Sequence, residues 1–179
     1  MLPTIPRELR GARDRAMLLI GFAGGLRRSE LVGFDHGRDD TINSAGWVQV
    51  VDEGLLLTLR RKTGWREVEI ARGSAPETCP ATALSHWLNE AQIDFGPLFT
   101  AVSRDDLRST GARLSDKHVA RLVKSCAETA GLDPRQYSAH SLRAGLDKSA
   151  KAAGPCFRQH DPARSTQKQR FPPQPHQSR

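Results

Sequence analysis

The chain has 179 residues, enough for one domain and a tail, and 37% of them are hydrophobic. No run approaches the roughly 18 apolar residues that span a bilayer, so we expect no membrane partner. The first residues lack the pattern of a secretory signal, which predicts a cytoplasmic protein. The net charge is +7, but residues 151–179 carry six Lys/Arg against one Asp, so the first 150 residues hold only +2. Any case for a nucleic-acid partner must therefore rest on particular residues.

Cysteine usage argues against disulfides and metals. The three cysteines, Cys79, Cys126 and Cys156, form no C-x-x-C pair, and no carboxylate or Cys/His cluster stands nearby. We expect reduced thiols and no metal site.

Helix and strand signals alternate in the first half of the chain. Residues 13–23 read as a buried helix that Gly24 and Gly25 end, and a second helix begins around Ser29. Residues 47–51, 55–60 and 67–70 read as strands of an antiparallel sheet, with a turn at residues 62–64.

The second half is mainly helical. One helix begins near Pro80, and apolar residues at helical spacing predict another between Ser115 and Gly131. A last short helix begins near Ser141 and fades before Gly154. The predicted fold class is α+β, mainly α-helical with a small antiparallel β-sheet.

Composition changes abruptly near Gly154. Residues 155–179 hold five of the eleven prolines and five glutamines but no Leu, Ile or Val. Such a segment cannot bury enough apolar surface to offset its ordering entropy. We predict a folded domain over residues 1–150 and a disordered basic Pro/Gln-rich tail over residues 151–179.

Four separated basic residues suit one chemical task, which is holding a phosphodiester. They are Arg27 in Gly-Leu-Arg-Arg-Ser-Glu-Leu (residues 25–31), Lys62 on the hairpin turn, and His140 with Arg143 in Ala-His-Ser-Leu-Arg-Ala-Gly (residues 139–145). Guanidinium groups bind phosphate oxygens bidentately, Lys can protonate a leaving oxygen, and His can donate to phosphate or move a proton. We expect the four side chains to converge on one basic concavity.

These motifs, in this order, resemble the catalytic domain of the tyrosine recombinases, the phage-integrase family, over roughly residues 10–150. The resemblance implies that Arg27 is the first catalytic arginine, with Glu30 supporting it. It also implies that Lys62 is a general acid and that His140 and Arg143 form the His-x-x-Arg pair. The implied function is site-specific DNA recombination and integration through a 3′-phosphotyrosyl link, as in mobile elements. Double-stranded DNA is the implied partner, intact recombinase protomers are a further one, and no cofactor or small-molecule substrate is implied.

The sequence also departs from the family pattern. The family's nucleophilic tyrosine follows the His-x-x-Arg pair, whereas the only tyrosine here, Tyr137, precedes it. Because the resemblance begins near residue 10, we also expect the N-terminal helical domain of the family to be absent. We therefore predict an incomplete domain without a nucleophile, unable to cleave DNA. A non-catalytic DNA-binding or regulatory fragment and a pseudogene product without a role are the alternatives.

Each singled-out residue also has a simpler interpretation. Arg27, His140 and Arg143 could be solvated charges near helix ends, Lys62 an ordinary turn lysine, and Glu30 a helix-surface charge. Tyr137 is interpreted as a packing or loop residue and not as a displaced nucleophile. The three tryptophans, Trp47, Trp65 and Trp87, are interpreted as core or edge residues and not as base-stacking platforms.

Overall fold

The computed structural model describes residues 2–38, 41–62, 64–138, 141–142 and 144–146. The predicted tail, residues 151–179, lies outside them, as does the end of the predicted last helix. Within the described part of the chain, no helix is long and apolar enough to cross a membrane.

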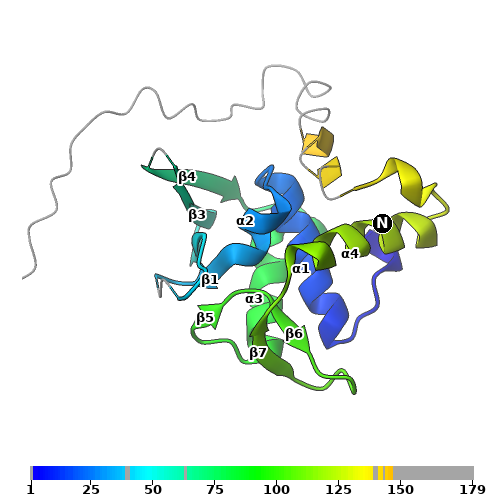
Figure 1. The fold of residues 1–179 in the computed structure, drawn as a ribbon, viewed down its shortest axis with the longest axis horizontal. Helices are drawn as coiled ribbons and strands as arrows, with labels where there is room; N and C mark the ends of the chain where they lie inside the picture. Colours follow the sequence, from blue (N-terminus) through cyan, green and yellow to red (C-terminus); the bar gives the residue numbers. More distant parts are fainter. Residues whose placement is uncertain (1, 39–40, 63, 139–140, 143, 147–179) are drawn as a thin grey trace, which may run out of the picture.

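In the part of the chain that the structure describes, four complete α-helices and two sheets are present, and residues 141–142 and 144–146 are also helical (Figure 1). The helices are α1 (Leu9–Ala23), α2 (Arg28–Gly33), α3 (Pro80–Ala91) and α4 (Asp116–Thr129), with 3-10 turns at Leu2–Thr4, Pro76–Thr78 and Pro134–Gln136. The strands are β1 (Phe34–His36), β2 (Gly46–Val51), β3 (Gly54–Arg61), β4 (Gly64–Ala71), β5 (Gly96–Pro97), β6 (Thr100–Val102) and β7 (Ser109–Arg113). The predicted α+β class is confirmed.

The main sheet has the order β4-β3-β2-β1-β5. The three predicted strands are confirmed as antiparallel neighbours, and Leu55 pairs with Ile70 and Leu57 with Val68, as their alternation implies. The sheet is nevertheless mixed, because β1 runs parallel to β2. Strands β1 and β5 have three and two residues, too few to show a periodicity in the sequence.

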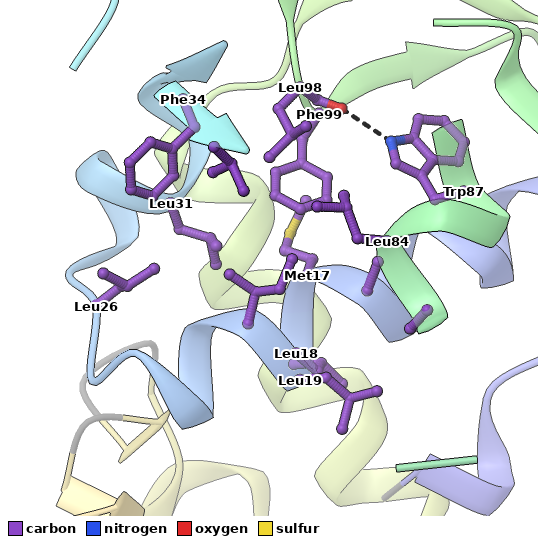
Figure 2. Close-up of a cluster of buried hydrophobic side chains, with 14 of the residues drawn as sticks. Met17, Leu18, Leu19, Leu26, Leu31, Phe34, Leu84, Trp87, Leu98 and Phe99 are labelled. Carbon is purple, nitrogen blue, oxygen red and sulfur yellow. Dashed lines mark hydrogen bonds between the residues drawn. The ribbon is translucent and has the colours of Figure 1, made fainter. Parts of the chain in front are cut away.

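Helix α1 lies at the centre of the core (Figure 2). Met17 lies in the same cluster as Leu84 of α3 and Phe99, and all three are fully buried. Trp87 of α3 is also buried, and its indole Nε1–H donates to the Leu98 carbonyl at 2.8 Å. The helices thereby cover one face of the main sheet and leave its other face outside the core.

A buried ion pair fixes the short strand β1 that follows α2. The fully buried carboxylate of Asp35 accepts hydrogen bonds from the backbone N–H and hydroxyl of Thr41 and from Arg113 of β7. Arg113 also donates to the carbonyls of Val32 and Phe34 at 3.0 Å. Arg113 thus ties β7 to the end of α2 and the start of β1.

The hydrogen bonds decide the charge state of Asp35. Burial alone would raise the pKa of this carboxyl, but the bonds from Thr41 and Arg113 outweigh burial and hold the pKa below its ordinary value of 3.8. The contribution to stability is therefore complete above pH about 4 and is lost as the pH falls through the lowered pKa of the folded state.

We expect Asp35→Asn to lower the free energy of unfolding by about 3 kcal/mol at neutral pH, because it leaves the Arg113 charge without its counterion. Urea unfolding of both proteins at neutral and acidic pH measures this difference. The difference in unfolding free energy between the two proteins should become smaller in acid, where the wild-type carboxylate is protonated. A difference in unfolding free energy that does not change with pH would show that Asp35 does not act through its charge.

Candidate functional site

Arg27 stands at the junction between α1 and α2. Helix α1 ends at Gly24 and Gly25, and Gly25 has the positive φ of 57° that this turn requires. Leu26 is buried, whereas the side chain of Arg27 is 60% exposed. Arg27 is the N-cap of α2, where its backbone N–H donates to Glu30 Oε2 at 2.9 Å. The turn of the chain therefore presents the guanidinium to solvent.

Glu30 is a buried carboxylate shared by two arginines. Its Oε1 lies 3.3 Å from Arg27 Nη1 and 3.0 Å from Arg61 Nη2. Only 9% of Glu30 is exposed, so its interpretation as a solvated helix-surface charge does not hold. Glu30 instead links the start of α2 to the end of β3.

Arg61 reaches Glu30 because of the strand's alternation. On β3 it shares the core-facing side with Leu55, Leu57 and Leu59, all buried. Its Nε is buried without a hydrogen-bond partner among the described residues. The carboxylate of Glu30 is therefore the main counterion for a guanidinium that is three-quarters buried.

Lys62 follows Arg61 at the tip of the β3–β4 hairpin, which the Arg61–Gly64 pair closes. Lys62 is exposed and lines a concavity of about 480 Å³ together with Arg27. The remaining lining residues are Arg61, Gly64, Trp65 and Arg66. Two of the four residues expected to converge thus lie on one concave surface, although they come from different elements.

The concavity is strongly basic. Four cationic side chains line it, and Glu30, which contacts Arg27 and Arg61, offsets one charge. A phosphate group entering it would meet guanidinium forks and an ammonium, both of which donate hydrogen bonds to phosphate oxygens.

His140 and Arg143 lie outside the described residues, whereas residues 141–142 and 144–146 next to them are described. Residues 141–142 and 144–146 are helical, which confirms the start of the last predicted helix. A side chain on Gly145 would bring its Cβ within 2.8 Å of the Phe22 ring. Similarly, a Cβ on Gly25 would come within 3.1 Å of Leu146. This helix therefore packs against the end of α1, immediately before Arg27.

Tyr137 sits at the end of the 3-10 turn Pro134–Gln136. It is half-buried and packs against the hydrophobic core. This is the position of a packing residue.

Sequence reasoning missed three side chains that line the concavity: Arg61, Trp65 and Arg66. Arg61 carried a usable signal, because a strand that buries Leu55, Leu57 and Leu59 must also turn Arg61 inward. A buried arginine requires a carboxylate partner. The other two face the concavity only because of the hairpin register.

A double-mutant cycle tests the link between Glu30 and Arg61. We expect Glu30→Gln and Arg61→Met to couple by about 1 kcal/mol in urea unfolding, since both side chains are largely buried. The Arg28–Asp116 pair, at 2.9 Å but more exposed, is the matched control and should couple by about 0.3 kcal/mol. Equal coupling energies in the two cycles would show that burial does not strengthen the interaction between Glu30 and Arg61.

Comparison with known proteins supports the resemblance. No protein-family model matches the chain. An integrase/recombinase xerD homolog of Selenomonas ruminantium is 37% identical over 149 residues, which cover 80% of this chain and 40% of that protein. The chain thus spans about two-fifths of the length of this relative.

Solved structures show the same fold. The XerH site-specific recombinase bound to difH substrate in a pre-cleavage complex superposes with a TM-score of 0.60, at 19% identity, over 86% of this chain and 40% of XerH. Its post-cleavage complex with a palindromic difH substrate gives a TM-score of 0.56, at 20% identity, over 81% of this chain and 37% of XerH. The relationship to the Selenomonas protein, together with the shared fold, supports a domain of the tyrosine recombinase family in this chain.

Proposed function

We propose that this domain binds double-stranded DNA and holds one phosphodiester in the basic concavity, as the phosphate-binding part of a site-specific recombinase. The observation that carries the proposal is that Arg27 and Lys62 line one concavity, joined there by Arg61 and Arg66. The site is basic and open to solvent. It therefore suits the sugar-phosphate backbone of a nucleic acid better than it suits a small molecule, which a pocket usually encloses.

The roles follow from the chemistry of each group. Arg27 can offer its guanidinium group to the non-bridging oxygens. Its backbone N–H donates to the carboxylate of Glu30, which holds the main chain of Arg27 in place. Lys62, exposed at the hairpin tip, can donate a proton to a leaving oxygen. Donors already aimed at a phosphate stabilise the charge that develops during transfer.

His140 and Arg143 are proposed as the remaining phosphate ligands. Support comes from the helical residues around them, which pack against the end of α1 next to Arg27. In the sequence the two residues are three apart, a spacing that puts side chains on one face wherever it falls within a helix. They would add one guanidinium and one imidazole to the cationic side chains that line the concavity.

The relatives agree with this partner. The XerH structures contain difH substrate, and the Selenomonas protein is named an integrase/recombinase. We propose double-stranded DNA as the partner here, intact recombinase protomers as further partners, and the cytoplasm as the compartment.

Cleavage in this family would join a tyrosine oxygen to phosphorus while the 5′ oxygen leaves with a proton. Tyr137 is the only tyrosine of the 179 residues and packs against the core. This observation favours a second candidate, in which the polypeptide binds DNA as a non-catalytic or regulatory form.

DNA affinity tests the first proposal. We expect Arg27→Ala and Lys62→Ala each to weaken binding of a labelled short duplex about 10-fold and to reduce the salt slope by about 0.9, as loss of one phosphate contact does. Fluorescence anisotropy over a salt series measures both quantities. Arg104→Gln, on the β6–β7 turn at the opposite side of the molecule, is the control that should change little (Figure 1). Absence of duplex binding by the wild type would refute the proposal.

Covalent trapping separates the two candidates. We expect incubation with a nicked suicide duplex to leave no protein attached to a 3′ end, because phosphate ligands alone supply no nucleophile. Denaturing electrophoresis detects any adduct. An adduct that disappears in Tyr137→Phe would instead assign cleavage to Tyr137.

A further inference from the structure

A cation–aromatic stack lies beside the concavity on the outer face of the main sheet. The Trp47 and Trp65 rings lie 4.9 Å apart between centroids, tilted by 52°. Arg38 lies over the Trp47 ring, with Cζ 5.3 Å from the centroid, and Arg60 lies over the Trp65 ring at 5.1 Å. Four side chains from three strands and the end of β1 thus form one row.

The sheet register builds this row. Trp47 pairs across β2 and β3 with Thr58, and Arg60 pairs across β3 and β4 with Trp65. Alternation places Trp47, Arg60 and Trp65 on the face away from Leu57 and Leu59, and Arg38, beyond the end of β1, reaches this face over the Trp47 ring. Thr58 is only 5% exposed, whereas Trp65 is 53% exposed. The tryptophans therefore cover the strand beneath them, but Trp65 itself stays open to solvent.

Charge on this face is segregated. The row lies toward the β3–β4 tip, which carries Lys62, whereas Glu67 and Glu69 follow Trp65 on the same face of β4. The β2–β3 turn at the far end carries Asp52 and Glu53. An anionic partner is therefore attracted to one end of the sheet and repelled from the other.

We infer that the row of Arg38, Trp47, Trp65 and Arg60 is a second contact surface for the sugar-phosphate backbone of DNA. It engages phosphates that flank the one held by Arg27 and Lys62, so the inference rests on the proposed function. Trp65 belongs to both the row and the concavity, which makes the two surfaces continuous.

The stacking geometry favours phosphates over bases. Each ring already has a guanidinium over it and the other tryptophan beside it, so a base could stack only by displacing one of these neighbours. The rings instead hold two long arginine side chains in place, which lowers the entropy lost when each binds a phosphate. Contacts of this kind do not read sequence.

The test uses the full chain with a labelled short duplex of mixed sequence and the matching single strand. Arg38→Gln and Arg60→Gln should each reduce the salt slope of duplex binding by about 0.9 relative to Arg104→Gln. Trp65→Ala should weaken duplex binding about 2- to 5-fold, since Arg60 loses its support, and Trp65→Phe should retain most of it. Circular dichroism and thermal unfolding establish that each variant is folded.

The outcomes separate the two proposals. If Arg27→Ala weakens binding but the variants of the row match Arg104→Gln, the row is no contact surface and the concavity stands alone. If Trp65→Ala lowers affinity for the single strand more than for the duplex, while Arg60→Gln has no effect, the row stacks bases and our inference is wrong. If the wild type binds no duplex, both proposals fall.

Discussion

The carboxylate of Glu30 joins the two segments on which the concavity is built. It accepts hydrogen bonds from the backbone N–H and the guanidinium of Arg27 at the start of α2, and it forms an ion pair with Arg61 at the end of β3. Arg27 and Lys62 come from elements that share no local sequence, so their spacing depends on this carboxylate and on the packing around it. Because Glu30 is buried, its charge is little screened by salt, and the link persists where a surface ion pair would weaken.

A second ion pair secures the other end of α2. Arg113 of β7 holds Asp35 and the carbonyls of Val32 and Phe34, which fixes the passage from α2 into β1. Since α2 has only six residues, it gains little stability from its own hydrogen bonds. Its orientation is therefore set by ion pairs at both ends and by the buried side chain of Leu31.

The sequence predicts the helices and strands that have a clear hydrophobic periodicity, and it misses those whose position depends on pairing with residues far away in the chain. The helices around residues 13–23 and 115–131, and the leucine alternation in β3, were readable because each buries a regular face. Strand β1, parallel to β2, was not, because its pairing is decided by Asp35 and Arg113, which lie far apart in sequence. Within the site, residue types predicted Arg27 and Lys62 as candidates, and the family resemblance added Glu30. The contributions of Trp65 and Arg66 depend on hairpin register, which no local pattern specifies.

The basic character of the site is local and owes little to the composition of the domain, since the first 150 residues carry a net charge of only +2. Strand alternation separates the charges. Arg61 turns inward to Glu30, Arg60 turns outward over Trp65, and the tip between β3 and β4 presents Lys62. The acidic side chains of β4 lie beyond Trp65, toward the far end of the sheet. A nearly neutral domain can thus attract a polyanion to one edge, because the field at short range depends on the nearest charges and is screened beyond about 10 Å.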